Sequence, residues 1–139
     1  MLRGINHITL VVSDLERSLA FYRDVLGCKL RARWVRGAYL SAGDAWLCLE
    51  LGRATSPAST SNDTHIAFDV ARENFHALRL RLVSQAELWK SNTSEGDSVY
   101  FLDPDGHKLE VHVGSLESRL AFALEKYDGM VLMDERGPH

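Results

Sequence analysis

The chain has 139 residues, enough for one compact domain or for two small modules that share a core. Its hydrophobic fraction of 45% and charged fraction of 25% are ordinary for a protein that folds in water. A net charge of −3 gives no broad attraction to nucleic acid or to an anionic membrane, so neither is an expected partner. The sequence shows no signal-peptide pattern and no apolar run near the ~20 residues of a membrane span, which predicts a cytoplasmic protein.

The first part of the chain, about residues 3–51, predicts a β-α-β-β-β module. A strand is expected over 5–12, because apolar residues alternate there with a second set that includes His7. The segment Ser13–Glu16 has the form of a capping box and predicts a helix over 14–26. Three further strands are expected over 28–35, 37–41 and 45–51.

The same order recurs in the second part of the chain. Residues 52–63 are small and polar, which predicts a flexible linker between the halves. Beyond it, THIAFDV at 64–70 repeats the pattern of NHITLVV, and a helix is expected over 72–84. A second module over about 64–113 would give one α+β domain whose two curved, mixed sheets enclose a pocket. Its remaining predicted elements are strands over 86–91, 98–102 and 107–113, a turn at Asp103–Gly106, and a Ser115-capped helix within the C-terminal segment 115–139.

A metal site is indicated by His7 and His65, which hold equivalent positions in the first strands of the two halves. A twofold relation between the halves would bring both imidazoles to one central site. Glu110 alternates with apolar neighbours in the last strand of the second half, so it faces the side where the pocket is expected. Two imidazoles and one carboxylate leave coordination positions open for a substrate, and this set suits Mn²⁺, Fe²⁺, Co²⁺, Ni²⁺ or Zn²⁺.

Glu50 is a further candidate ligand, because WLCLEL in the first half corresponds to HKLEVHV in the second. As the symmetry mate of Glu110, it would complete a site of two histidines and two glutamates with fewer open positions. As the end of a strand beside the linker, it would instead be a charge that faces solvent. The second interpretation is preferred.

The segment 89–100 concentrates groups that bind oxyanions. Hydroxyls and an ammonium donate charge-assisted hydrogen bonds to a phosphate or phosphonate, and Arg119 can add a bidentate contact. Carbonyl and hydroxyl oxygens in the same segment can also hold a monovalent cation. A plain surface loop is the alternative, since no glycine fingerprint accompanies these residues. The groups concerned are Lys90, Ser94, Ser98 and Tyr100, around Gly96.

Taken together, these residues resemble the vicinal oxygen chelate superfamily. Within it, they resemble the manganese- and potassium-dependent fosfomycin resistance enzymes that use glutathione. The resemblance runs from NHITLVVSDLERSLAFYRDVLG through GAYLSAGDAWLCLEL to SEGDSVYFLDPDGHKLEVHVGSLESRL, and so spans nearly the whole chain. The stretch DPDGHKLE is common in the superfamily, whereas the segment 89–100 discriminates better between substrates.

The resemblance implies a domain-swapped homodimer in which paired modules form a metal cup. It assigns His7 and Glu110 to one chain and His65 to its partner. It also implies Mn²⁺ and K⁺ as cofactors, and fosfomycin and glutathione as substrates. The implied substrate-binding residues are Thr9, Trp46, Lys90, Ser94, Ser98, Tyr100 and Arg119. The implied potassium ligands are Asn92, Ser94, Gly96 and Ser98, and the implied catalytic residues are Thr9, near the epoxide oxygen, and Tyr39, near the thiol.

The reaction implied by the resemblance is attack of glutathione thiolate on C1 of fosfomycin, with the metal stabilising the alkoxide that develops. Arg36, Glu50 and Thr93 depart from the family pattern where the thiol channel is shaped. The chain lacks the insertion that carries an extra carboxylate in epoxide-hydrolysing relatives, so hydrolysis is not expected. Two alternatives stay open: a glyoxalase-like isomerase, which a ligating Glu50 would support, and a metal-free drug-binding module, which the paired histidines disfavour.

Overall fold

The computed structural model describes residues 1–53 and 62–133, so most of the predicted linker and the end of the tail lie outside the described part. Within that part, no helix is both long enough and apolar enough to cross a membrane. The predicted order, β-α-β-β-β twice and then a helix, is confirmed. The elements are β1 (His7–Val12), α1 (Leu15–Leu19), the π-helical η1 (Ala20–Val25), β2 (Lys29–Trp34), β3 (Gly37–Ala42), β4 (Ala45–Leu51), β5 (Ile66–Asp69), α2 (Arg72–Gln85), β6 (Glu87–Lys90), β7 (Asp97–Leu102), β8 (Lys108–Val113) and α3 (Leu116–Lys126).

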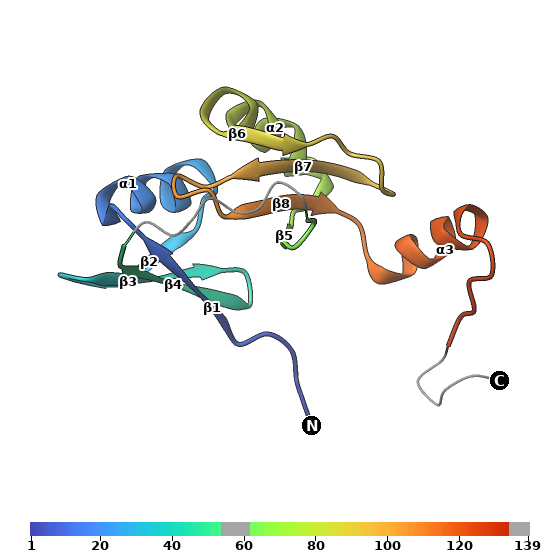
Figure 1. Cartoon of the computed structure of the whole chain (residues 1–139), viewed down its shortest axis with the longest axis horizontal. Coiled ribbons are helices and arrows are strands. Elements are labelled where there is room, and N and C mark those ends of the chain that lie inside the picture. Colours follow the sequence, from blue (N-terminus) through green and yellow to red (C-terminus); the bar gives the residue numbers. More distant parts are fainter. Residues whose placement is uncertain (54–61, 134–139) are drawn as a thin grey trace.

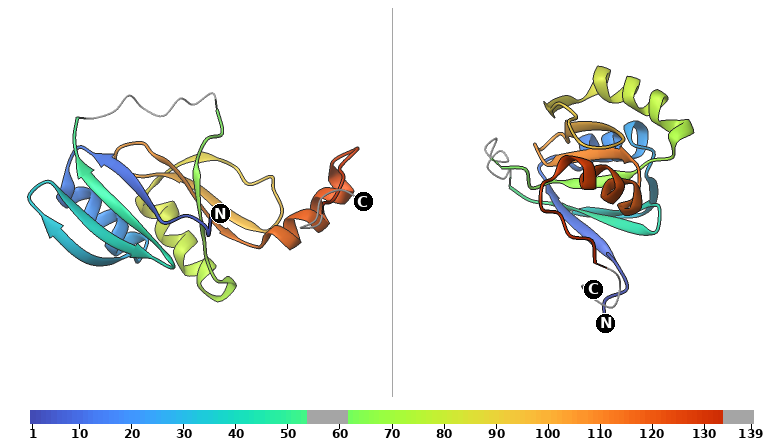
Figure 2. Two further views of the ribbon diagram at one scale, coloured as in Figure 1. Left: turned by 90° about the horizontal axis from the view of Figure 1, so that it is seen from below. Right: turned by 90° about the vertical axis from the view of Figure 1, so that its right-hand side faces the viewer.

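Two four-stranded mixed sheets form the architecture, one in each module, and confirm the α+β class (Figure 1). The first sheet has the order β1-β4-β3-β2 and the second the order β5-β8-β7-β6. In each sheet the first strand pairs in parallel with the last, and the other neighbours are antiparallel. The modules lie side by side, and α3 extends from the end of the second module that is remote from the first sheet (Figure 2).

The two modules repeat each other down to an irregularity in the strand pairing. The register shifts between Leu30 and Ala32 where β2 meets β3, and between Leu88 and Lys90 where β6 meets β7. The offset between these two bulges is the one that separates His7 from His65. A repeated bulge at the repeated position supports the duplication predicted from the strand patterns.

Strand alternation gives each sheet an apolar face and a polar face. Leu10 and Val12 of β1 are buried, whereas His7 and Thr9 remain exposed on the other side of the strand. The apolar faces form one core that continues across both modules, and the rings of Phe21 and Phe101 join the two halves with centroids 6.1 Å apart. Burial of this shared apolar surface holds the modules together.

The first helix begins differently from the prediction. Asp14 is the N-cap, and its side chain accepts a hydrogen bond from the Arg17 backbone N–H at 3.0 Å. Ser13 lies one residue earlier, and its backbone N–H donates to Asp105 at 3.1 Å. The predicted Ser13 capping box is therefore wrong, because the backbone N–H and the hydroxyl of Ser13 donate to Asp105 of the other module instead. At the other end of the chain, Ser115 caps α3 as predicted.

The predicted helix over 14–26 is present, but its second half is a π-helix. The Leu26 backbone N–H donates to the Phe21 carbonyl, five residues back, at 3.1 Å. The widened turns place Phe21, Tyr22 and Val25 all in the core. Short π segments accommodate such crowded faces, and periodicity alone does not reveal them.

The turn between β7 and β8 fastens the second module to the first. The Tyr22 hydroxyl donates to the Asp103 carboxylate at 2.7 Å, and both side chains are buried. Asp105 accepts from Ser13, and His107 Nε2 lies 2.8 Å from the Val11 carbonyl. The sequence predicted this segment only as a turn, but its hydrogen bonds make it a polar clamp between the modules. Figure 1 shows the turn beside the first helix.

Alkaline unfolding provides a test of this clamp. Burial and the neighbouring Asp103 carboxylate raise the pKa of Tyr22 well above the ordinary value of about 10. The folded state therefore keeps the phenol proton at a pH where the unfolded chain loses it, so this contribution to stability falls as pH rises above about 10. Tyr22→Phe should cost about 1–3 kcal/mol at pH 8, through loss of a buried hydrogen bond, and less at pH 11.

Denaturant unfolding of both proteins at the two pH values measures the difference. Tyr127→Phe is the matched control, because Tyr127 is about half exposed and should change stability little at either pH. A cost for Tyr22→Phe that does not change with pH would contradict the linkage.

Candidate metal and anion-binding site

The parallel pairing of β5 with β8 brings two of the predicted metal ligands together. Ala67 pairs with Glu110, so His65, two residues earlier, projects from the same face of the second sheet. His65 Nε2 lies 2.9 Å from Glu110 Oε2. Glu110 is only 4% exposed, and such a buried carboxylate requires strong partners.

Both predicted histidine ligands are oriented by an oxygen at Nδ1. The Nδ1 atom of His65 contacts the Asp63 carbonyl, and the Nδ1 atom of His7 lies 2.7 Å from Asn6 Oδ1. An N–H at Nδ1 leaves the lone pair on Nε2, and metal-binding histidines are commonly fixed in this way. In both residues Nε2 is therefore the nitrogen suited to a metal.

His7 lies in the other sheet, with three more of the predicted site residues. Its ring stacks on Trp46, with centroids 4.2 Å apart and planes at 17°. The ring of Tyr39 meets that of Trp46 edge-on, with centroids 5.0 Å apart. Thr9 and Tyr39 both pair with Cys48, so Thr9 lies on the same face of the sheet as Tyr39. His7, Thr9, Tyr39 and Trp46 thus form one surface on the polar face of the first sheet.

The predicted anion-binding hydroxyls cluster beside Glu110 on the second sheet. Tyr100 pairs directly with Glu110, and the Ser98 hydroxyl donates to Glu110 Oε1 at 2.6 Å. The hydroxyls of Ser94 and Tyr100 are 3.3 Å apart. Hydroxyls from β7 and from the turn before it thus gather near one metal-ligand candidate.

Two cationic side chains flank this cluster. Lys90 Nζ donates to the Asp63 carboxylate at 2.9 Å and lies 5.3 Å from the centre of the Tyr100 ring. The hydrogen bond to Asp63 raises the pKa of Lys90, so the ammonium stays charged near neutrality. Arg119, on the first turns of α3, lies with Nε 3.5 Å from Glu95. An anion near Tyr100 would therefore meet hydroxyls and positive charge.

The turn before β7 carries the residues predicted to hold potassium. Asn92 Oδ1 accepts from the backbone N–H and the hydroxyl of Ser94, both at 3.0 Å, and Asn92 Nδ2 donates to the Gly96 carbonyl at 2.9 Å. Gly96 has a φ of +74°, and a Cβ there would come within 2.3 Å of the Val113 carbonyl. The turn thus collects carbonyl and hydroxyl oxygens, the donors that K⁺ prefers.

One chain does not assemble the predicted ligand set by itself. Across residues 1–53 and 62–133, no three His, Cys, Asp or Glu side chains gather closely enough to hold a metal ion. His65 lies beside Glu110 in the same chain, whereas His7 lies on the other sheet. This geometry corrects the division implied by the resemblance, which grouped Glu110 with His7. Strand pairing within the second module joins His65 to Glu110, and the module boundary separates both from His7.

The strand register also corrects the match between Glu50 and Glu110. The offset that relates His7 to His65 also makes Thr9 of the first module equivalent to Ala67 of the second. Thr9 pairs with Cys48, whereas Ala67 pairs with Glu110. Cys48 is therefore the structural mate of Glu110. Glu50 is exposed and corresponds to His112, so reading it as the mate of Glu110 is wrong. The similar sequences WLCLEL and HKLEVHV suggested an alignment of the two strands that is two residues out of register.

Two residues beside the site were missed in the sequence, His112 and Glu95. His112 Nδ1 lies 2.6 Å from the Ser98 hydroxyl, and its Nε2 lies 3.1 Å from Glu95. Burial opposes ionisation of Glu95, but hydrogen bonds from His112, Ser118 and Arg119 hold its pKa below the usual value. The alternation of Glu110 and His112 along one strand was a signal for His112, whereas the turn sequence held none for Glu95.

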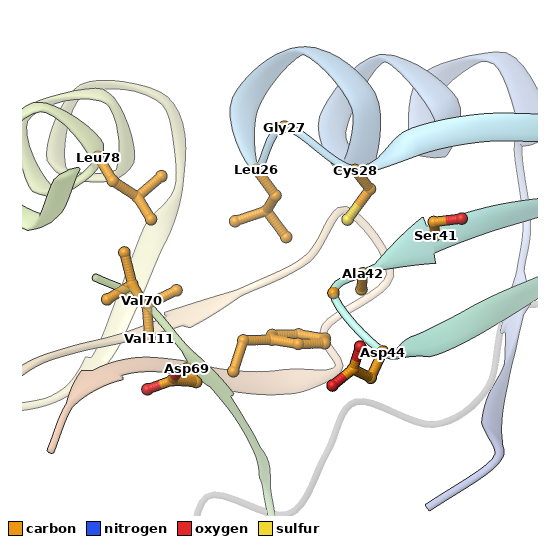
Figure 3. Close-up of a pocket in the computed structure, with 12 residues that line it drawn as sticks. Leu26, Gly27, Cys28, Ser41, Ala42, Asp44, Asp69, Val70, Leu78 and Val111 are labelled. Atoms are coloured by element: carbon orange, nitrogen blue, oxygen red, sulfur yellow. The ribbon is translucent and has the colours of Figure 1, made fainter. Parts of the chain in front are cut away.

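A cavity between the two modules lies away from the candidate site. It has a volume of about 410 Å³ and is lined from both modules, by Cys28 and Leu26 on one side and Val70, Leu78 and Val111 on the other (Figure 3). Burial raises the pKa of the Cys28 thiol to about 11, so this thiol stays neutral at pH 7. The described residues that line it include none of the predicted site residues.

A second hollow, of about 350 Å³, does adjoin the candidate site. It lies where β5 and β8 meet the start of α3, and its lining includes Asp69, His112 and Arg119. This hollow leaves room for a small ligand next to the candidate anion-binding arginine.

Residues 4–111 match the Glyoxalase/Bleomycin resistance protein/Dioxygenase superfamily. The chain belongs to this superfamily. It is 52% identical over 139 residues to the glutathione transferase FosA of Serratia marcescens, covering 97% of this chain and 99% of that protein. It is 38% identical over 130 residues to the metallothiol transferase FosB of Staphylococcus epidermidis, covering 90% and 94%.

Solved structures of the superfamily support the same placement. The fosfomycin resistance protein FosX of Listeria monocytogenes, complexed with Mn(II) and sulfate, aligns with a TM-score of 0.73 at 29% identity. The alignment covers 86% of this chain and 99% of that one. FosX of Mesorhizobium loti aligns with a TM-score of 0.72 at 29% identity, over 86% and 99%. Within the superfamily, this chain therefore belongs to the fosfomycin resistance thiol transferases and is an enzyme.

Metal binding provides the test of Glu110. Because removing even an outer partner of a metal ligand costs about 10–100-fold in affinity, Glu110→Gln should weaken Mn²⁺ binding by at least about 100-fold with the fold retained. Glu50→Gln is the matched control and should bind Mn²⁺ like the wild type. Titration calorimetry measures both, with circular dichroism as the check of folding. Wild-type affinity in a folded Glu110→Gln protein would remove Glu110 from the metal site.

Proposed function

We propose that this enzyme adds glutathione to C1 of the fosfomycin epoxide and thereby inactivates the antibiotic. The observation that carries the proposal is the contact of His65 with Glu110, set among the hydroxyls and cations of the second sheet. Glutathione is the proposed thiol because the chain is 52% identical to a glutathione transferase over almost its full length.

A divalent metal, proposed to be Mn²⁺, fits the donor atoms that the structure brings together. His65 Nε2 and Glu110 Oε2 converge at 2.9 Å, and their contacts to Asp63 and Ser98 hold them in place. We propose that the partner subunit's His7 completes the set in a homodimer. Mixed nitrogen and oxygen ligands of this kind suit first-row divalent metals.

The phosphonate of fosfomycin would lie against the second sheet. Lys90 supplies a fixed positive charge, and Ser94, Ser98 and Tyr100 supply hydroxyl donors within one small region. Arg119 would add a planar two-donor contact from α3. We propose that these groups orient a small phosphonate with its epoxide directed toward the metal ligands.

The partner's first sheet would cover the reacting end of the substrate. A dimer that brings in the partner subunit's His7 also brings in the polar face on which His7 lies. The partner subunit's Thr9 would then lie near the epoxide oxygen, and the partner subunit's Trp46 would line the pocket. The partner subunit's Tyr39 would lie toward the thiol.

At C1 the reaction forms a C–S bond and breaks a C–O bond. The glutathione sulfur, after loss of its proton, attacks C1, and the electron pair of the C1–O bond passes to the oxygen. That oxygen gains a proton, so the proton lost by the thiol is balanced by the proton of the new hydroxyl, and the net change is addition of the thiol across the C1–O bond. When bound, the metal supplies Lewis-acid stabilisation of the negative charge on this oxygen. We propose that Tyr39 helps to deprotonate the thiol.

Potassium is proposed to bind at the turn formed by Asn92, Ser94, Gly96 and Ser98. A cation there would lie beside the anion-binding hydroxyls, because Ser94 and Ser98 belong to both groups. It would add positive charge near the phosphonate and fix the orientation of the hydroxyls.

The alternatives receive less support. A glyoxalase-type isomerase would be supported by Glu50 as a fourth metal ligand. The strand register instead places Cys48 at the position equivalent to Glu110. A metal-free drug-binding module would not need two histidines oriented through Nδ1.

The reaction itself is tested by loss of fosfomycin with Mn²⁺ present. We expect rapid loss with glutathione, slower loss with cysteine and none with water alone, because a thiol is the proposed nucleophile and glutathione is the proposed thiol. Mass spectrometry should show a product with the mass of both substrates combined. Loss without thiol would indicate hydrolysis instead, and no loss in any arm would overturn the functional proposal.

Mixed dimers test where the ligands come from. If His7 of one subunit meets His65 and Glu110 of the other, inactive His7→Ala and Glu110→Ala proteins should regain activity when refolded together. Random pairing yields about a quarter of the wild-type activity, since half of the dimers are mixed and each has one intact site of two.

The matched control is a mixture of His65→Ala with Glu110→Ala. Both changes then fall in the same half-site, so no mixed dimer contains an intact site and activity should stay absent. Recovery in this control, without recovery in the first mixture, would contradict the proposed division.

A further inference from the structure

A continuous set of polar contacts leads away from Glu110 to the start of α3. Ser98 Oγ lies 2.6 Å from both Glu110 Oε1 and His112 Nδ1. His112 Nε2 lies 3.1 Å from Glu95 Oε1. The same Glu95 oxygen accepts from the Ser118 hydroxyl at 3.2 Å and lies 3.5 Å from Arg119 Nε. The buried Glu95 carboxylate is therefore linked to the candidate metal ligand Glu110 through His112 and Ser98, and it also contacts the candidate anion-binding Arg119.

The backbone is shaped to admit this pair. A Cβ on Gly114 would lie 2.6 Å from His112 Nε2 and 2.7 Å from Glu95 Oε1, closer than any side chain tolerates. A Cβ on Gly96 would lie 3.0 Å from His112 Cε1. Both glycines also have positive φ, +156° and +74°. Two special backbone positions thus enclose the contact between Glu95 and His112.

Neither Glu95 nor His112 belongs to the apolar core of the protein. His112 lies on the polar face of β8, and its apolar neighbours Val111 and Val113 point to the opposite side. Glu95 is 9% exposed although it lies on a turn, where a carboxylate would ordinarily face solvent. A buried carboxylate against a partly buried imidazole at this place calls for a role beyond packing.

We propose that Glu95 and His112 are positioning residues that couple the metal ligand Glu110 to the anion-binding Arg119. His112 holds the Ser98 hydroxyl against Glu110, and Glu95 holds both His112 and the first turn of α3. The inference rests on the proposed function, since it takes Glu110 as a ligand and Arg119 as an anion contact. Partners of this kind commonly change metal affinity without touching the metal.

Mn²⁺ titration of the protein without substrate, followed by the paramagnetic resonance signal of the unbound ion, tests the proposal. Glu95→Gln and His112→Gln should each weaken Mn²⁺ binding by about 10–100-fold, the range for outer partners of metal ligands. Glu117→Gln is the matched control, because Glu117 is an exposed carboxylate on the first turn of α3. It should bind Mn²⁺ like the wild type.

A double-mutant cycle separates coupling from general destabilisation. In a Ser98→Ala background, Glu95→Gln should cause little further loss of Mn²⁺ affinity, because the hydroxyl through which His112 is proposed to act on Glu110 is already removed. Equal losses in both backgrounds would contradict a route through Ser98. A merely structural role would lower the melting temperature of the metal-free protein and leave the Mn²⁺ affinity of the folded fraction unchanged.

The anion side has its own readout. Inorganic phosphate binding, measured with Mn²⁺ at saturation, should weaken in Glu95→Gln and stay normal in Glu117→Gln. If wild-type protein fails to bind Mn²⁺, the proposed function fails first. If wild type binds Mn²⁺ and the Glu95 and His112 variants match it, only the positioning inference is overturned. His112→Gln keeps the test decisive should Glu95→Gln not fold.

Discussion

The parallel pairing of the first strand with the last in each module is the constraint on which the candidate site depends. In the second module it sets Ala67 against Glu110 and so brings His65 to within 2.9 Å of that carboxylate. A shift of one residue would turn Glu110 into the apolar core and Val111 out of it. The buried apolar face of the sheet therefore enforces the register that the polar face uses.

The second constraint is the clamp formed by the turn between β7 and β8. Asp103 and Asp105 hold Tyr22 and Ser13 of the first module, and Phe21 packs against Phe101 close by. These contacts hold the two modules together with their apolar faces toward each other. The two polar faces therefore remain separate surfaces that a ligand or a second chain can contact. The predicted site residues are divided between the two modules, with His7, Thr9, Tyr39 and Trp46 on the first face and the others on the second module, which is why a second chain enters the functional proposal.

The two polar faces differ in character. That of the second sheet is a network of buried charge, in which Glu110 and Glu95 each have several hydrogen-bonding partners. That of the first sheet exposes large aromatic side chains, with Trp34 42% and Tyr39 41% exposed. Exposed aromatic surface around a histidine is typical of a face that another protein surface covers.

Strand alternation and the repeat of NHITLVV in THIAFDV were enough to predict the modules, the order of elements and the pairing of His7 with His65 as equivalent residues. These features follow from local patterns, because the side-chain period of strands and helices is written in neighbouring residues. Only the tertiary structure showed that His65 lies with Glu110 in one chain, that Cys48 rather than Glu50 corresponds to Glu110, and that Glu95 is buried against His112. Those three results depend on strand register and on a turn folding back over a sheet, and both are decided by contacts between residues far apart in the sequence.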